Sequence, residues 1–304
     1  MQIIKNNLLP APIALFCFNR PVHLQTTIEY LKRNPSTKES DLFVFSDGPR
    51  ANSSEDLEKV TEVRVLLSQI SGFKSVKIIE NMLNKGLASS IIDGLNMVFE
   101  DHGQVIVLED DILVSEDFLD FMNEGISKYE NVGSIFSISG YSFQLNMLDF
   151  SKDLNLVKRA SSWGWGTWRN EWQSVDWAVE TFPEFKLDKA KMSDFKNAGN
   201  DQLPMLIKQQ FGLISSWAVR WTYHHYLKNG FCVVPKLSKV KNIGTDGSGT
   251  NFNQKTRRYD TVLNNQIINF PEKLEEDIIV TNFIRNYYTP SSIRRFINWM
   301  KFGV

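Results

Sequence analysis

Short apolar runs that alternate with helical stripes fill the first half of the chain. The runs are "PIALFC", "LFVF", "SVKIIE", "VIVL" and "SIFSIS", between residues 12 and 139. Between them, apolar residues recur every three or four positions, which is the spacing of one helix face. Those stripes are Leu24, Ile28 and Leu31; Leu57, Val60, Val63, Leu67 and Ile70; and Leu87, Ile91, Leu95 and Val98. Strands that alternate with helices predict an α/β fold, with helices flanking a mostly parallel, Rossmann-like sheet.

Composition and charge narrow the class of protein. With 304 residues and 42% hydrophobic content, the chain can bury a large core. The formal charge is −1, so no overall field attracts the protein to nucleic acid. Cys17 and Cys232 both lie in apolar runs, which favours reduced core thiols. No segment approaches 18 uninterrupted apolar residues, and we expect a soluble, cytoplasmic protein.

The second half of the chain has a different texture. Tryptophans crowd residues 163–177, and strands no longer alternate clearly with helices. We expect this half to build on the sheet rather than to extend it. The predicted division is a nucleotide-binding half at 1–140, an acceptor half at 141–289 of the same compact domain, and a tail at 290–304.

The tail predicts a short basic amphipathic helix. Its apolar residues are Ile293, Phe296, Ile297, Met300 and Phe302, and its cations are Arg294, Arg295 and Lys301. Such a helix can bind an anionic membrane surface weakly, at the inner face of the membrane. The alternative is a C-terminal helix that packs on the domain.

Polar residues follow the predicted strands where each strand ends. They are Phe18, Asn19 and Arg20 after the first strand, Asp47 after the second, and Glu109, Asp110 and Asp111 after the fourth. Ligands of open α/β sheets bind at the carboxyl ends of the strands, so these residues predict a binding crevice. Adjacent carboxylates repel each other, and Mg²⁺ or Mn²⁺ would offset that repulsion. The alternative is an acidic start to the next helix, together with Glu116 and Asp117.

Several motifs in order carry a resemblance to a known family. "CFNRP", "SDGP", "NKGLASS" and "LEDDI" follow one another, with "SSWGWGTW" and "FCVVPKLSKVKNIGTDGSGTNF" further on. Together they resemble nucleotide-sugar-dependent glycosyltransferases of GT-A fold, in particular the N-acetylglucosaminyltransferase I group and its bacterial relatives. The resemblance covers most of the chain. It implies an inverting, metal-dependent transfer from a UDP-sugar, with UDP-GlcNAc favoured, to a hydroxyl of a glycan, glycoprotein or lipid-linked acceptor, such as a surface polysaccharide.

The resemblance also implies roles for the residues after the strands. Asp47 would bond the uracil, Arg20 would contact the base and diphosphate, and Asp111 would be the direct ligand of Mn²⁺ or Mg²⁺. Glu109 and Asp110 would face the donor sugar and the ribose. Phe18 and Asn19 belong to the same donor segment, and Lys85 would reach the diphosphate or the sugar.

The catalytic base is not apparent from the resemblance. The eukaryotic enzymes supply a carboxylate from a Trp-Asp-Asp-Trp segment, whereas "SWAVRW" has Ala218 and Val219 at the acidic positions. Replacement candidates are Asp246, which we favour, His224, His225 and Asp201. Deprotonation of the acceptor hydroxyl requires such a group, because transfer otherwise lacks a proton acceptor.

Two tryptophans predict an acceptor cleft. Aromatic faces stack on sugar rings, and Gly164 between Trp163 and Trp165 would allow a close approach of the backbone. We expect Trp168, Trp172 and Trp177 to lie in the core.

Two other functions remain open at this stage. A sugar-1-phosphate nucleotidyltransferase would need a Gly-rich phosphate loop, but residues 13–31 contain no glycine. A non-catalytic protein that binds nucleotide sugar or glycan would explain the missing acidic pair.

Overall fold

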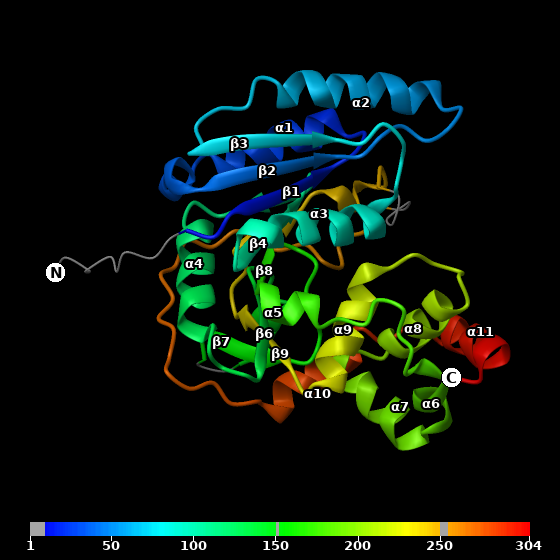
Figure 1. Ribbon diagram of the computed structural model, residues 1–304. Helices are drawn as coiled ribbons and strands as arrows, with labels where there is room; N and C mark the ends of the chain where they lie inside the picture. Colours follow the sequence, from blue (N-terminus) through cyan, green and yellow to red (C-terminus); the bar gives the residue numbers. More distant parts are fainter. Residues whose placement is uncertain (1–9, 150–151, 250–254) are drawn as a thin grey trace.

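An eight-stranded sheet forms the centre of the protein, as the computed structural model shows for residues 10–149, 152–249 and 255–304 (Figure 1). The strands are β1 (Ile13–Cys17), β2 (Asp41–Ser46), β3 (Ser75–Glu80), β4 (Gln104–Glu109), β6 (Ile135–Ser139), β7 (Leu154–Val157), β8 (Trp165–Trp168) and β9 (Phe231–Pro235). Their order across the sheet is β3-β2-β1-β4-β8-β6-β9-β7. All run parallel except β8 and β7, which are antiparallel to their neighbours. The predicted α/β class with a mostly parallel sheet is confirmed.

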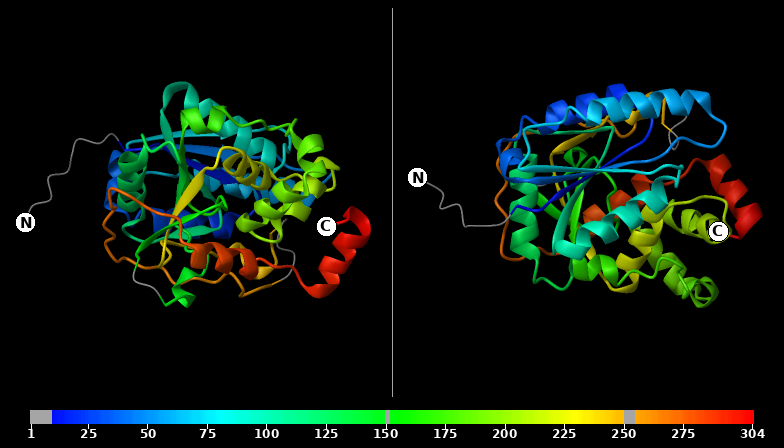
Figure 2. Two further views of the ribbon diagram at one scale, coloured as in Figure 1. Left: turned by 90° about the horizontal axis from the view of Figure 1, so that it is seen from below. Right: turned by 45° about the horizontal axis from the view of Figure 1, so that its top comes forward.

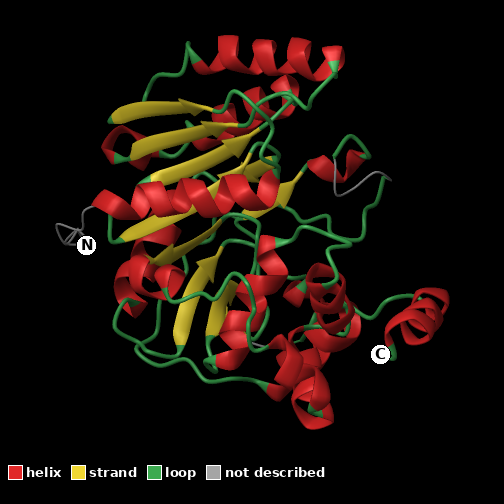
Figure 3. Cartoon of the chain, turned by 45° about the vertical axis from the view of Figure 1, so that its right-hand side comes forward, coloured by secondary structure: helices red, strands yellow, loops and turns green. Residues whose placement is uncertain are grey.

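Helices cover both faces of the sheet (Figure 3). The α-helices are α1 (Pro21–Leu31), α2 (Ser54–Leu67), α3 (Leu87–Asp101), α4 (Phe118–Tyr129), α5 (Arg169–Gln173), α6 (Phe182–Leu187), α7 (Lys189–Phe195), α8 (Gln202–Gln210), α9 (Trp217–Leu227), α10 (Ile278–Tyr287) and α11 (Ser292–Phe302). Short 3₁₀ turns are η1 (Pro35–Glu39), η2 (Leu145–Met147), η3 (Lys196–Ala198) and η4 (Gly244–Asp246). Apolar residues of α1, α2 and α4 pack on one face, and those of α3 and α9 pack on the other.

Strand β1 shows why both faces need cover. All five of its residues are buried, and they alternate between the two apolar clusters. Ile13, Leu15 and Cys17 belong to the cluster under α1 and α2, whereas Ala14 and Phe16 belong to the cluster under α3. A strand buried on both faces reads as a continuous apolar run, which is the pattern of "IALFC".

The second half of the chain extends the sheet, and our expectation that it would only build on the sheet is wrong. Strands β7, β8 and β9 all come from residues 154–235 and pair within the same sheet. Strand β8 has the sequence "WGTW", and all four of its residues are buried. With bulky residues at both ends and a glycine inside, it shows neither the alternation nor the β-branched run by which strands are recognised.

The last two helices differ in their packing. Helix α10 lies against the body of the molecule, whereas α11 projects from it (Figure 2). In the described residues, no helix combines the length and apolar character needed to span a bilayer. Cys17 and Cys232 are buried and unpaired, as expected for core thiols.

Helix α3 approaches the sheet closely at Gly94. A Cβ atom there would lie 2.7 Å from the ring of Phe16 and 3.1 Å from the ring of Phe45. These two rings are stacked on each other, with centroids 4.8 Å apart, so neither can move without disturbing the other. The absence of a side chain at Gly94 therefore sets the distance between α3 and the sheet.

We expect Gly94→Ala to lower the free energy of unfolding by about 1–2 kcal/mol. Overpacking costs roughly 1–3 kcal/mol, and the better helix propensity of alanine offsets part of it. Urea denaturation would measure the change. Gly103→Ala is the matched control, because a Cβ atom there would meet nothing within 4 Å. An unchanged midpoint for Gly94→Ala would mean that the two rings move aside without cost.

Candidate functional site

The polar residues after β1, β2 and β4 meet at one edge of the sheet. The strands are parallel and in register, with Cys17 paired to Ser46 and Phe16 paired to Glu109. The residues that follow these positions therefore emerge side by side, at the edge toward which the arrows of β1, β2 and β3 point in Figure 1. The predicted convergence of three strand ends is present.

Arg20 joins the two aspartates after β4. Its guanidinium Nη2 contacts Asp110 Oδ1 and lies 2.9 Å from Asp111 Oδ2. The backbone N–H of Phe18 donates to Asp110 Oδ2 at 3.3 Å, so Asp110 is held from two sides. Burial of the guanidinium opposes its charge, yet the two carboxylates raise the pKa of Arg20 above its usual range. A cation thus already compensates part of the acidic cluster.

Glu109 and Asp110 are costly to ionise. Burial raises the pKa of Glu109, and the charges of Asp111 and Asp110 raise it further. Burial also raises the pKa of Asp110, although Arg20 counteracts this shift. With the pKa of Glu109 raised to about 8, Asp110 and Asp111 share one guanidinium, and a further cation nearby would favour the ionised form of all three carboxyl groups.

Asp111 has one oxygen free for a ligand. Its Oδ1 atom is buried and has no hydrogen-bond partner in the structure. A buried carboxylate oxygen without a partner is unfavourable, and it is a suitable ligand for a hard divalent cation. Among the described residues, no group of three His, Cys, Asp or Glu side chains forms a metal cluster. The residues therefore fit a metal that takes Asp111 from the protein and its other oxygens from elsewhere, as Mg²⁺ often does with phosphates.

A late loop covers Asp111. The strand β10 (Val240–Asn242) pairs with β5 (Ile112–Val114), and the N–H of Ile243 donates to the carbonyl oxygen of Asp111 at 2.9 Å. Gly244 follows, and a Cβ atom there would lie only 2.0 Å from Asp111 Oδ2. Glycine is thus required where the loop passes over the carboxylate.

The same loop carries Asp246, the predicted base. Its carboxylate lies 3.3 Å from His23 Nε2 and accepts hydrogen bonds from the hydroxyl and the N–H of Ser248. These bonds from Ser248, with a smaller effect of His23, lower the pKa of Asp246. The side chain is 44% exposed, so an acceptor could reach it. Sequence reasoning missed His23, whose signal was its place in the first turn of the helix that follows "FNR".

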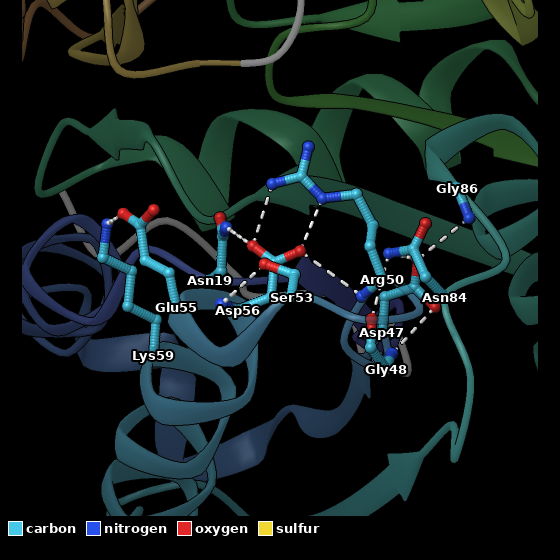
Figure 4. Close-up of polar contacts among 10 residues, drawn as sticks. All are labelled: Asn19, Asp47, Gly48, Arg50, Ser53, Glu55, Asp56, Lys59, Asn84 and Gly86. Atoms are coloured by element: carbon cyan, nitrogen blue, oxygen red, sulfur yellow. Dashed lines mark hydrogen bonds and ion pairs between the residues drawn. The ribbon is translucent and has the colours of Figure 1, made fainter.

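Asp47 is already fully bonded within the protein. Its two oxygens accept from the N–H groups of Gly48 and Gly86 and from the side chain of Asn84 (Figure 4), and from the N–H of Lys85, all at 2.9–3.0 Å. Gly86 precedes α3 with φ +75°, a conformation that glycine adopts readily. A uracil could bond Asp47 only by displacing one of these donors. In this structure Asp47 holds the start of α3 against the end of β2.

Lys85 also differs from its predicted position. Its ammonium pairs with Asp93, in the second turn of α3, at 3.1 Å. Both side chains are about half exposed, so the pair contributes little energy. A ligand could therefore displace Asp93 at low cost.

A second charged cluster lies beside Phe18. The carboxylate of Asp56 accepts from Asn19 Nδ2 at 2.7 Å and from the guanidinium and N–H of Arg50 (Figure 4). The guanidinium carbon of Arg50 lies 5.7 Å from the centroid of the Phe18 ring. Asn19 is thus engaged with α2. Sequence reasoning missed Arg50 and Asp56, because the contact of Asp56 with Asn19 joins distant parts of the chain and that of Arg50 depends on the turn before α2.

His224 and His225 lie away from this edge, and Asp201 is paired within the protein. The rings of both histidines pack on Phe136 at the start of β6, which is the opposite edge of the sheet. Burial lowers the pKa of His224 to about 4, so its ring is neutral. Asp201 is engaged elsewhere, because both of its carboxylate oxygens accept from the guanidinium of Arg159, whose carbon lies 3.9 Å from the ring centroid of Tyr288. The catalytic role predicted for His224 does not fit this position.

The two tryptophans assigned to an acceptor cleft differ in exposure. Trp165 is fully buried and stacks on Trp217, with ring centroids 5.1 Å apart. The acceptor role predicted for Trp165 does not fit this burial, because no face of its ring is open to a sugar. Trp163 is partly buried and precedes β8 at the same edge as the carboxylates, where its ring contacts Tyr141.

We expect Asp56→Ala to lower the free energy of unfolding at pH 7 by about 1–3 kcal/mol, because it removes several buried hydrogen bonds. Arg50 holds the pKa of Asp56 well below its usual range. The stabilisation is therefore complete above about pH 4 and is lost as the pH falls further. Urea denaturation from pH 7 to pH 3 should show the difference between wild type and variant shrinking. Glu58→Ala, an exposed change in the same helix, is the control, and a difference independent of pH would contradict the assignment.

Comparisons with known proteins identify the family of the chain. The family model "Glycosyl transferase family 2" matches residues 13–172. The mannosyltransferase PcManGT from Pyrobaculum calidifontis, solved in complex with GDP-Man and Mn²⁺, shares 10% sequence identity at a TM-score of 0.34. That match covers 55% of this chain and 49% of the mannosyltransferase, so this chain spans about half of that protein's length. No curated protein matches the chain.

The matched region contains β1 to β4 and every strand end that forms the crevice. The central sheet with flanking helices has the GT-A-like arrangement expected of such a protein. Because the family model covers more than half of the 304 residues, the chain belongs to glycosyl transferase family 2.

Proposed function

We propose that the protein transfers a sugar from a UDP-sugar to an acceptor hydroxyl with the help of Mn²⁺ or Mg²⁺. The observation that carries this proposal is the buried Asp111, whose Oδ1 atom is free and whose Oδ2 atom pairs with Arg20. A nucleotide diphosphate needs both a cation and a guanidinium, and here the two sites are adjacent. UDP-GlcNAc is the favoured donor on the resemblance to N-acetylglucosaminyltransferase I alone.

Each residue of the candidate site would have its own role in binding the donor. Asp111 would hold the metal, which when bound would stabilise the negative charge of the diphosphate. Arg20 would bind the diphosphate, at the cost of loosening its contact with Asp110 or Asp111. Phe18, with Arg50 above its ring, offers a flat surface for the base. Glu109 and Asp110 would bond the ribose and the donor sugar.

Asp246 would take the proton from the acceptor hydroxyl. Its lowered pKa keeps it ionised at neutral pH, and it follows Gly244, the residue at which its loop passes over Asp111. Inversion would require the acceptor hydroxyl to attack the donor sugar on the face opposite the leaving diphosphate. Trp163 and the surface around it would bind the acceptor, which we propose is a glycan or a lipid-linked sugar.

A second function is a nucleotide-sugar-binding protein without turnover. The observation in its favour is the missing acidic pair, since Ala218 lies in the apolar cluster with α3 and Val219 is buried. Neither position offers a base, and catalysis therefore depends on Asp246. A sugar-1-phosphate nucleotidyltransferase is less favoured, because no Gly-rich loop follows β1.

The proposed function can be tested by incubating the protein with Mn²⁺ and a set of UDP- and GDP-sugars. We expect slow hydrolysis of one UDP-sugar, and NMR of the released sugar should show an inverted anomer. Binding of a UDP-sugar without any hydrolysis would favour the non-catalytic function. A retained anomer would exclude the inverting mechanism and the role of Asp246.

We expect Asp111→Asn to reduce the Mn²⁺-dependent part of UDP affinity by at least about tenfold, because it removes the charge that offsets the metal. The fold should persist, since Arg20 keeps its partner Asp110. Calorimetric titration of UDP with and without Mn²⁺, together with thermal melts, measures both effects. Asp101→Asn, at an exposed position on α3, is the matched control. If UDP affinity depended equally on Mn²⁺ in wild type and in Asp111→Asn, the carboxylates would not be a metal site but only an acidic segment before the next helix.

A further inference from the structure

Helix α11 presents its apolar face to solvent. Ile293, Phe296, Trp299 and Met300 are each at least 60% exposed, whereas Asn298 is buried. The helix is thus held to the protein by a polar residue together with Phe302, whose ring stacks on Phe211 after α8. An amphipathic helix normally buries its apolar face, so this orientation leaves a surface that needs a partner.

Cations surround this apolar face. Lys208 of α8 lies 6.0 Å from the ring centroid of Phe302, and its pKa is lowered by burial and by the charges of Arg294 and Lys301. Among the described residues, none of these three cations forms an ion pair with a carboxylate. Cations that repel one another without a nearby acid indicate an anionic partner.

A pocket of about 980 Å³ lies between α10, α11 and the start of α8, and Phe296 and Trp299 of the apolar face line part of it. It is lined by the cationic side chains of Lys196, Arg285 and Arg295 and by several amides and hydroxyls. Asn298 also lines it, and its Oδ1 atom is buried without a hydrogen-bond partner. The pocket therefore offers cations for a phosphate and an acceptor for a hydroxyl.

Helix α11 and the candidate site lie on the same side of the molecule. Helix α11 lies on the side of the molecule toward which β1, β2 and β3 point, in the views of Figure 1 and Figure 3. A surface bound by α11 would therefore face the same side as the strand ends that carry Arg20 and Asp111.

We propose that α11 binds the surface of an anionic lipid bilayer. The apolar residues Phe296, Trp299 and Met300 would insert at the interface, and the cations would contact phosphates. The pocket would take a headgroup that carries both a phosphate and hydroxyls, such as phosphatidylglycerol. A second copy of the chain fits less well, because a symmetric contact would bring the cations of both helices together. This inference goes beyond the proposed function and does not depend on it.

Vesicle flotation of the full chain tests the proposal. We expect flotation with an equal mixture of phosphatidylcholine and phosphatidylglycerol at low salt, and none with phosphatidylcholine alone. High salt should release the protein, because the Debye length falls from about 10 Å at 0.1 M to about 3 Å at 1 M. Equal binding to neutral vesicles would overturn the role of the cations.

Two pairs of variants separate the contributions. Arg294→Glu with Lys301→Glu should weaken vesicle binding by at least about tenfold. The matched control, Lys38→Glu with Lys77→Glu, makes the same change in net charge at exposed positions away from α11. Phe296→Ser with Met300→Ser should also weaken binding by at least about tenfold. Its control, Leu57→Ser with Val65→Ser, alters equally exposed apolar residues of α2.

Each outcome decides the proposal. Loss of binding in both α11 variants, with both controls unchanged and circular dichroism intact, supports it. Variants that float like wild type would overturn it. A dimer in analytical ultracentrifugation that Phe296→Ser with Met300→Ser dissociates, without vesicle binding by wild type, would assign the face to a second copy. UDP binding should be unaffected in all variants, so failure here is distinguishable from failure of the proposed function.

Discussion

The rest of the candidate site depends on the ion pairs of Arg20 with Asp110 and Asp111. Buried carboxylates are stable in a protein only when paired or hydrogen-bonded, and this guanidinium serves two of them at once. It also ties the start of α1 to the end of β4, so the strand ends on either side keep their positions. The loop approaches this ion pair closely because Gly244 has no side chain: a Cβ atom there would lie 2.0 Å from Asp111 Oδ2 and 2.7 Å from Arg20 Nη1. The site and the local fold therefore depend on the same ion pair.

Hydrogen bonding divides the acidic residues of this edge into two groups. Asp47 and Asp56 accept bonds from backbone and side-chain donors of neighbouring segments, and those bonds fix the start of α3 and of α2. Such carboxylates shape the walls of a crevice. Asp111 Oδ1 has no such donor, although it is buried. An acid that the protein leaves unsatisfied is the one with capacity for a ligand, which is why Asp111 rather than Asp47 carries the proposed function.

The first half of the fold and the place of the crevice could be predicted from sequence, because β1 to β4 and the helices between them follow simple periodicities. The strands from the second half could not, since "WGTW" of β8 lacks any strand period although Trp165 is buried on the sheet. The bonds of Asp47 depend on residues 84–86, whose proximity follows from the fold alone. The same holds for His224, whose distance from the carboxylates follows from the direction of α9 into β9. Local sequence patterns thus predict helices, strands and strand ends, whereas the hydrogen bonds and contacts of each side chain depend on residues distant in the chain.

The arrangement of α11 relative to the crevice bears on how an acceptor would be met. If the proposed bilayer contact holds the protein, the donor crevice faces the surface, and a membrane-borne acceptor would meet it at a high effective concentration. A single short helix with a few cations binds membranes weakly and reversibly. Weak binding suits such an enzyme, because the protein can leave one acceptor and reach another without releasing a tight anchor. The attachment through Asn298 and the ring of Phe302 allows this, since it keeps the apolar face of α11 exposed instead of burying it in the core.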